Sequence, residues 1–338
     1  MRGLVSFFQN PWTRGLLVLA LLGLALFGIW WQGPEWSDVY HAFDFVRWWW
    51  IVAGFALNLL SVLSRAISWH VTIRQALPEP HPRFSHVFSA FGVGLLGNAI
   101  LPARAGELAR VAVLRRHLPH GPGTSATLLG TVFAHRLFDV VPVVLLVAYV
   151  FSTAKIPHWA VTSLVVVVLV GGALFTVAVV SARRGGSTLH DAPLPAAMAI
   201  FFQTVGWTLQ LLAVWVVTEA FEMDVPLSAA ALVLLLMNVA TIFPLWPGNV
   251  GLLQAAVALP LRQYGVAYGT GFAYGLVLQA IEMSVGVGVG LVMLAREGMS
   301  FATLRRMEEE QDSDENALPD GDGQTVEAER ESAGVASV

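Results

Sequence analysis

The residues best suited to do chemistry in this sequence cluster between Asn98 and Arg110, where a long apolar run stops. Asn98 and Pro102 end the run, Arg104 comes just before the next predicted helix, and Glu107 and Arg110 lie in its first turns. Glu107 and Arg110 are three residues apart and can pair on one helix face. Arg104 precedes the first turn, where free backbone N–H groups and the helix dipole favour an anion such as phosphate. The alternative is a structural cap in which the Arg–Glu pair holds the turn shut.

A second charged pair, Arg136 and Asp139, lies inside a later apolar segment. Charges within a membrane segment cost a few kcal/mol and are therefore functional candidates. The spacing of three residues predicts that the two side chains pair, and it leaves a ligand-binding role and a helix-locking role equally open. We expect His135 to pack or to hydrogen-bond, and Arg65 to extend toward the lipid headgroups.

Two further polar sets occur late in the chain. The first is a turn that allows close backbone approach and consists of Pro247, Gly248, Gly251 and Gln254. The second is Gln279 and Glu282, again three residues apart, which we interpret as helix-packing residues.

The elements that must position these residues are predicted to be membrane helices. The chain has 338 residues, of which 56% are hydrophobic and 12% are charged, whereas soluble domains carry roughly 25% charged residues. A membrane-spanning helix needs about 20 mostly apolar residues. Six segments qualify: 14–31, 48–70, 124–151, 158–181, 195–218 and 267–295.

Two other apolar stretches are interrupted by proline and glycine. Residues 86–101 are followed by 105–118, and residues 228–243 are followed by 250–262. Each half is too short to span comfortably, so we interpret each pair as a re-entrant helical hairpin, which requires protein or water around the broken backbone. The alternatives are proline-kinked spans or interfacial helices.

The distribution of basic residues favours this layout. With the N-terminus inside, fourteen arginines lie on the inner side and only Arg47, Lys155 and Arg262 on the outer side, as the positive-inside rule requires. The hairpins then enter from opposite sides, and the turns after Asn98 and Asn238 resemble each other weakly. The predicted fold is therefore an all-α polytopic membrane protein with about six spans and two hairpins in an inverted repeat, an arrangement typical of transporters.

The end of the sequence has a different composition. Residues 1–304 are predicted to form the transmembrane domain, and residues 305–338 a disordered acidic cytoplasmic tail, because this segment has little apolar content to bury. The sequence contains no cysteine, no phosphate-binding glycine loop and no His/Asp/Glu cluster with metal-ligand spacing. We therefore expect no cofactor, no metal and no enzymatic activity.

The motif from Asn98 to Arg110, the Arg136–Asp139 pair and the turn after Pro247 resemble the flippase-like transmembrane domain of the lysylphosphatidylglycerol synthases. The resemblance covers roughly residues 12–297. It implies a substrate-binding site containing Asn98, Arg104, Glu107, Arg110, Arg136, Asp139, Gly248, Gly251 and Gln254, with structural roles for Pro102, Gly106 and Pro247.

The chain departs from this family at several positions. His135 and Gln254 stand where the family has acidic residues, and the last span has Gln279 and Glu282 where the family has an arginine. In the full synthases a soluble C-terminal domain transfers the aminoacyl group. Here an acidic tail follows instead, so we expect that activity to be missing.

These observations predict a membrane lipid transporter, flippase-like, that moves a phospholipid or a polyprenyl-linked lipid between leaflets of the cytoplasmic membrane. Its partners would be lipids with anionic or phosphate-bearing headgroups, and nucleic acid is not expected. One alternative is a non-catalytic membrane partner of a separate glycosyltransferase or lipid synthase. Another is an intramembrane lipid transferase that uses Glu107 or Asp139 as a base.

The predicted topology can be tested by cysteine labelling, because the native chain has no cysteine. We expect Gly121→Cys to react with an impermeant thiol reagent only from the cytoplasmic side, since the arginine distribution places this loop inside. Labelling that occurs only from the outer side would rule out the hairpin topology.

Overall fold

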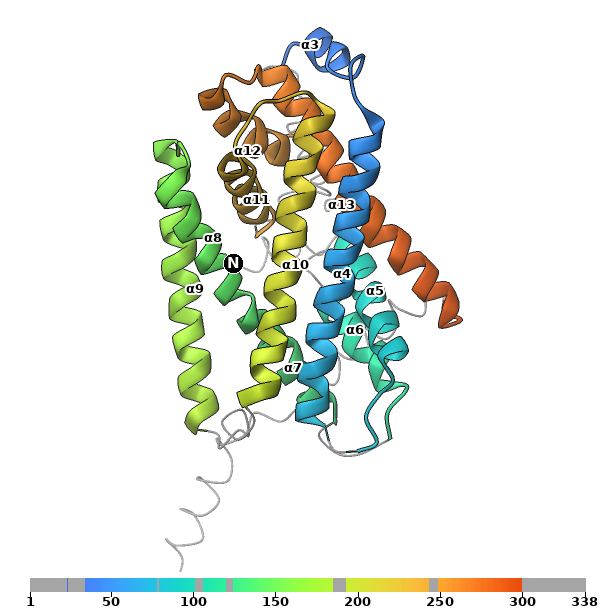
Figure 1. Cartoon of the computed structure of the whole chain (residues 1–338). Coiled ribbons are helices and arrows are strands. Elements are labelled where there is room, and N and C mark those ends of the chain that lie inside the picture. The colour runs from blue at the N-terminus through green and yellow to red at the C-terminus, as the bar shows by residue number, and fades with distance from the viewer. Residues whose placement is uncertain are drawn as a thin grey trace, which may run out of the picture.

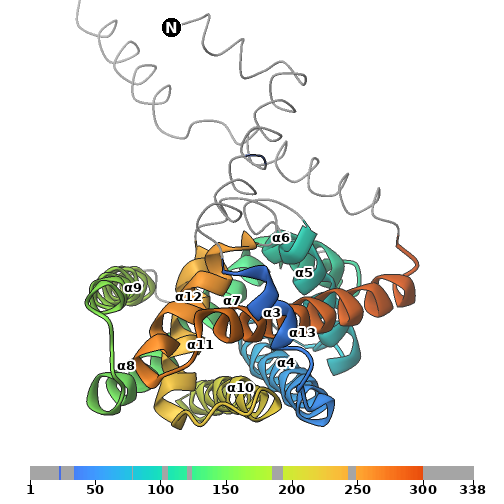
Figure 2. The same cartoon turned by 90° about the horizontal axis from the view of Figure 1, so that it is seen from above.

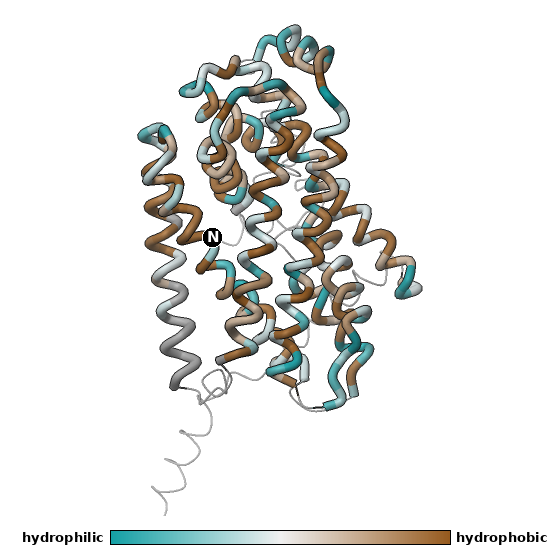
Figure 3. The backbone as a smooth tube through the Cα atoms, in the orientation of Figure 1, coloured by the Kyte–Doolittle hydropathy of each residue, from teal (hydrophilic) through white to brown (hydrophobic). Residues whose placement is uncertain are grey.

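The computed structural model describes residues 23, 34–77, 79–100, 106–119, 124–184, 193–242 and 249–299. Within these residues the fold is an all-helical bundle without strands (Figure 1). Hydrophobic residues follow the long helices, and hydrophilic residues gather mainly at the two ends of the bundle (Figure 3). The predicted class, an all-α polytopic membrane protein, is confirmed.

Four helical stretches in the described residues are long and apolar enough to cross a membrane. They are α4 (Trp48–Ala76), α7 and α8 together (Thr124–Phe138 and Val140–Thr153), α10 (Pro193–Ala220) and α13 (Tyr268–Arg296). These match four of the six predicted spans. A fifth, 158–181, coincides with α9 (His158–Arg184), and the first, 14–31, lies outside the described residues except for Gly23.

The third predicted span is interrupted at Asp139, between α7 and α8. Pro142 follows three residues later and has no N–H to donate to a carbonyl of the preceding turn. The interruption occurs at Asp139, one of the two charged residues of this predicted span.

Two pairs of short helices fill opposite ends of the bundle (Figure 1). The first pair is α5 (Phe84–Ile100) with α6 (Gly106–Arg115), and the second is α11 (Leu227–Ile242) with α12 (Leu252–Leu261). Even the longest, α5 with 17 residues, reaches only about 25 Å, less than the roughly 30 Å of a hydrocarbon core. The predicted helix pairs are therefore present, with ends within two or three residues of those expected.

Helices α4 and α10 pack along most of their length through a row of serine hydroxyls on α4. Ser61, Ser64 and Ser68 donate to the carbonyl oxygens of Gly206, Phe202 and Ala199 at 2.8, 2.7 and 2.8 Å. Small and hydroxyl side chains let membrane helices approach closely and hydrogen-bond across the interface. The same pair is joined at its end by Arg47 N donating to the carbonyl oxygen of Ala220 at 2.9 Å.

Helix α13 crosses the first pair of short helices at glycine (Figure 2). A Cβ on Gly290 would overlap Leu96 Cβ and lie 2.8 Å from the carbonyl oxygen of Gly92. Within the first pair, a Cβ on Gly106 would lie 2.5 Å from the backbone nitrogen of Asn98. Glycine at these positions is what allows the backbones to approach.

The end of α13 is also tied to the first pair of short helices by polar contacts. Glu297 accepts hydrogen bonds from Ser89 at 2.5 Å and from the His117 ring at 2.8 Å, and His117 stacks on His86. Burial acts to raise the pKa of Glu297, but these hydrogen bonds and the nearby imidazoles outweigh it and lower the pKa below its ordinary value.

The crossing of α13 and α5 predicts that alanine substitution changes the stability of the protein at one glycine of α13 but not at a nearby one. We expect Gly290→Ala to lower the melting temperature in detergent, because relieving an overpacked backbone contact costs about 1–3 kcal/mol. Gly288→Ala is the matched control on the same helix, since a Cβ there meets nothing within 4 Å. Equal melting temperatures for the two variants would contradict the described packing.

Candidate functional site

A carboxylate from the first pair of short helices binds two arginines at the centre of the structure. Glu107 on α6 lies 2.6 Å from Arg110 Nη2, and its other oxygen accepts a hydrogen bond from Arg136 Nη2 on α7. The pairing predicted for Glu107 and Arg110 is confirmed. Glu107 also makes a contact between elements that the sequence did not predict.

The two arginines have very different surroundings. Arg110 is 3% exposed, and its guanidinium carbon lies 4.7 Å from the ring centroid of Trp69 and 5.8 Å from that of Phe91. The Arg136 side chain is 45% exposed. Cation–π contacts stabilise a buried guanidinium, so Arg110 is fixed in the protein while Arg136 is accessible.

Asp139 is the second carboxylate in contact with Arg136. Its Oδ2 lies 3.5 Å from Arg136 Nη1, which confirms the predicted pair. Its Oδ1 accepts hydrogen bonds from Trp207 Nε1 at 2.7 Å and from Gln203 Nε2. Asp139 therefore joins the α7–α8 break to α10, and Arg136 remains more exposed than either carboxylate.

Arg65 extends this polar network toward α13. Arg65 Nη2 donates to Gln210 Oε1, and the Arg65 guanidinium carbon lies 5.1 Å from the ring centroid of Trp207. Gln210 Nε2 in turn donates to Glu282 Oε1 at 3.0 Å. The expectation that Arg65 reaches toward headgroups is wrong, because partners on α10 hold it inside the bundle. The charged network is formally neutral when its three arginines and three carboxylates are all ionised. Its members are Arg65, Arg110, Arg136, Glu107, Asp139 and Glu282.

The second pair of short helices has its own polar contacts. Gln254 is fully buried; its Oε1 accepts a hydrogen bond from Gly251 N at 2.6 Å, and its Nε2 donates to Gln279 Oε1 at 2.5 Å. Gly251 is the N-cap residue before α12, and its φ of 92° is a conformation that favours glycine. Gln279 and Glu282 thus contact different helices, α12 and α10, as expected of packing residues.

The predicted site residues therefore fall into three groups. Glu107, Arg110, Arg136 and Asp139 form one contact network, and the backbones of Asn98 and Gly106 meet beside it. Gly251 and Gln254 hydrogen-bond to each other in the second pair, and Gln254 also contacts α13. The remaining predicted residues lie outside the described residues: Pro102, Arg104, Pro247 and Gly248. No group of three or more potential metal ligands occurs in the part of the chain that the structure describes.

Comparison with known families identifies the chain. The lysylphosphatidylglycerol synthase TM region matches residues 15–290. The chain belongs to this family. No curated protein and no solved structure gave a match in the same comparison. Family membership associates the chain with membrane lipids. The matched range, residues 15–290, includes every residue of the charged network.

Reasoning from the sequence missed the part of the site contributed by α10. Gln203, Trp207 and Gln210 follow one another at intervals of four and three residues, so they share one helix face. That polar stripe within an apolar span was the available signal. It became interpretable only when the structure placed Asp139 and Arg65 opposite it.

The role of Glu107 predicts a large effect on stability. We expect Glu107→Gln to lower the melting temperature strongly, because removing one partner of a buried ionic contact costs about 3–5 kcal/mol. Glu222→Gln is the matched control: Glu222 pairs with Arg47 at 2.7 Å, but both side chains are more than half exposed, and such pairs contribute about 0–1 kcal/mol. Similar melting temperatures for the two variants would show that Glu107 is not a structural bridge.

Proposed function

We propose that this chain is a flippase-like membrane lipid transporter, and not an enzyme, that moves a phosphate-bearing lipid between leaflets. The substrate class is a phospholipid or a polyprenyl-linked lipid. The observation that carries the proposal is the half-exposed guanidinium of Arg136, held between two carboxylates within an apolar bundle. Family membership supports a lipid-related role.

The depth of Arg136 suits a headgroup that is crossing the membrane. Arg136 is the thirteenth residue of the stretch Thr124–Thr153, which has 30 residues. At 1.5 Å per residue, this places it about 18 Å from one end of a helical path of roughly 45 Å. A lipid phosphate bound there would lie deeper in the membrane than the headgroup layer, which is the usual position of lipid phosphates.

The contacts of Arg136 allow it to exchange partners at low cost. If a phosphate takes its guanidinium, Glu107 still faces Arg110, and Asp139 still accepts hydrogen bonds from Trp207 and Gln203. Neither carboxylate is then left buried and unpaired, which would be strongly destabilising. Arg136 can therefore bind phosphate bidentately while the surrounding network stays intact.

This arrangement assigns different roles to the arginines. Arg110 is enclosed by Trp69 and Phe91 and orients Glu107, whereas Arg136 is the residue that would contact substrate. Arg104, which lies between α5 and α6 in the sequence, is proposed to bind the phosphate as it enters.

The two pairs of short helices fit the same proposal as re-entrant hairpins of an inverted repeat. The two pairs lie at opposite ends of the bundle, and each is interrupted between its two helices (Figure 1). Broken helices near the membrane midplane are typical of secondary transporters. With the arginine-rich ends inside, the proposed location is the cytoplasmic membrane, with both termini cytoplasmic.

Lipid scrambling in vesicles tests the proposal. We expect Arg136→Lys to slow the movement of a fluorescent phosphatidylglycerol between leaflets by about tenfold or more, because lysine cannot bind phosphate bidentately and a charge-assisted hydrogen bond contributes about 1.5–3 kcal/mol. Arg116→Lys, on an exposed residue just after α6, is the control. The melting temperature of each protein is measured on the same preparation.

Wild-type scrambling by a well-folded Arg136→Lys protein would remove Arg136 from the substrate site. Purified wild-type protein that is inactive alone, but active together with a glycosyltransferase or synthase, would favour the partner alternative. A covalent change in the extracted lipid would favour a transferase.

A further inference from the structure

An apolar groove lies between α8 and α10, next to the charged network. Its volume is about 310 Å³, and its lining includes Pro142, Leu145 and Tyr149 of α8 and Trp207, Thr208 and Leu211 of α10. Figures 1 and 2 show α8 and α10 as neighbours at the side of the bundle. Leu145 is 59% exposed, so the groove is accessible from the surface that would face lipid.

The threonine hydroxyl groups of the groove do not make it polar. Thr208 Oγ1 donates to the carbonyl oxygen of Thr204, and Thr204 Oγ1 donates to that of Ile200, both at 2.9 Å. Both hydroxyl protons are thus used within α10, which leaves the methyl groups to line the space. The wall is suited to hydrocarbon.

Trp207 connects the groove to the charged network. Its ring lines the groove, and its Nε1 donates to Asp139 Oδ1 at 2.7 Å. Asp139 in turn contacts the half-exposed Arg136. One indole therefore separates an apolar groove from the proposed phosphate-binding arginine.

We infer that the α8–α10 groove binds one acyl chain of the same lipid molecule whose phosphate binds Arg136. This inference rests on the proposed function. The occupant must be narrow, because a protein helix is roughly 10 Å across and does not fit a space of this volume. A lipid combines the two chemistries that lie side by side here, a hydrocarbon chain and an anionic phosphate.

The direction of the groove specifies how the lipid is oriented. It begins at Pro142 and Trp207, beside Asp139, and continues to Tyr149 and Leu227, near the end of α8 and the start of α11. A chain lying in it points away from the end of the bundle where α7 begins. That is the orientation of a lipid from the leaflet on the α7 side, which the arginine distribution predicts to be cytoplasmic.

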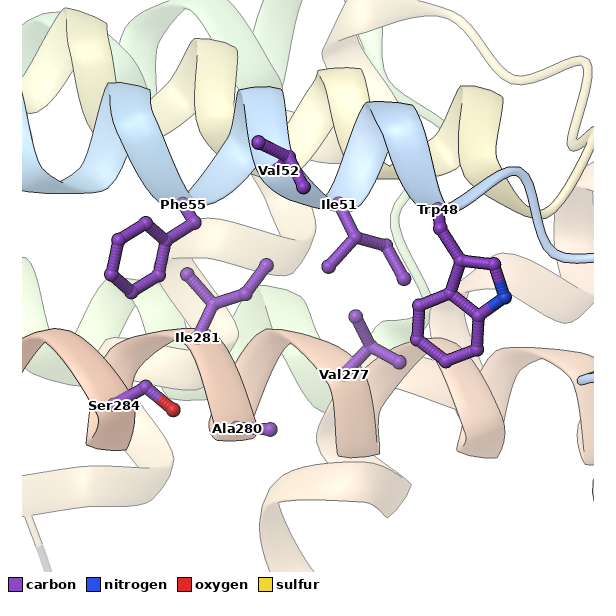
Figure 4. A pocket seen from close by; sticks show the side chains of 8 residues that line it. All are labelled: Trp48, Ile51, Val52, Phe55, Val277, Ala280, Ile281 and Ser284. Atoms are coloured by element: carbon purple, nitrogen blue, oxygen red, sulfur yellow. The ribbon is translucent and has the colours of Figure 1, made fainter.

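A second groove of similar size lies between α4 and α13 and provides a comparison (Figure 4). Its lining includes Trp48, Ile51 and Phe55 of α4 and Val277 and Ile281 of α13. Among the described residues, none of its lining side chains hydrogen-bonds to the charged network. It therefore lacks the adjoining phosphate site and is not assigned a substrate chain.

Photocrosslinking with a chain-labelled lipid tests the inference on the wild-type protein. The protein is reconstituted in phosphatidylcholine vesicles with a minor fraction of phosphatidylglycerol that carries a diazirine on one acyl chain. Leu60 is the reference position, because it is also exposed, by 49%. It lies twelve residues from Trp48, the first residue of α4, and Thr208 lies twelve residues from Ala220, the last residue of α10. These two helix ends are joined by the Arg47–Ala220 hydrogen bond, so Leu60 and Thr208 lie at the same depth.

We expect mass spectrometry to find crosslinks enriched at Leu145 and Thr208 over Leu60, and this enrichment to be lost in Arg136→Lys. Equal crosslinking at the three positions would mean that only bulk lipid touches the groove, and would overturn the inference. Enrichment that persists unchanged in Arg136→Lys would also overturn it, since the chain and the phosphate would then not belong to one bound lipid.

A groove-filling variant adds a functional measurement. We expect Leu145→Trp to slow scrambling by about tenfold, the effect of losing contact with about two methylene groups, and Leu60→Trp to leave it unchanged. Equal rates for these two variants would count against the inference even if both proteins fold well. Scrambling that depends on Arg136 without enriched crosslinks would refute this inference alone, whereas a wild-type protein that moves no lipid in any of these vesicles would refute the proposed function.

Discussion

The structure depends on each carboxylate of the charged network keeping a partner, and Arg136 is shared between Glu107 and Asp139. In an apolar bundle an unpaired charge is costly, and a pair satisfies the requirement only if its geometry is held by other groups. Arg110 and its two aromatic neighbours fix Glu107, while Trp207 and Gln203 fix Asp139. Residues of α6, α7 and α10 therefore meet at one point, together with Asp139 between α7 and α8.

The packing around this point relies on glycine and serine, which let the helix backbones approach closely. Gly106 and Gly290 bring backbones together where a single Cβ would clash. Serines on α4 place hydroxyls against carbonyl oxygens of α10 instead of inserting larger apolar groups. Membrane helices gain little from burying apolar surface against each other, so close approach and hydrogen bonding take over that role.

Much of the fold could be predicted from the sequence, because hydropathy sets helix positions and proline and glycine mark their ends. The short helices around Pro102 and Pro247 were predicted closely. The Glu107–Arg110 and Arg136–Asp139 pairs were also correct, since local helical spacing determines their geometry. The path of Arg65 was not predictable in this way. Its partners on α10 lie 142 and 145 positions further along the chain, and local spacing carries no information about which helices become neighbours.

The row of serines between α4 and α10 has a consequence for motion. Hydroxyl groups at three successive levels, with the backbone bond from Arg47 to Ala220 at one end, fix the axial register of these two helices. Sliding either helix by one turn would break every one of these bonds at once. The two helices are therefore expected to move as one rigid unit, and a rearrangement of the bundle would have to come from the helices packed against them.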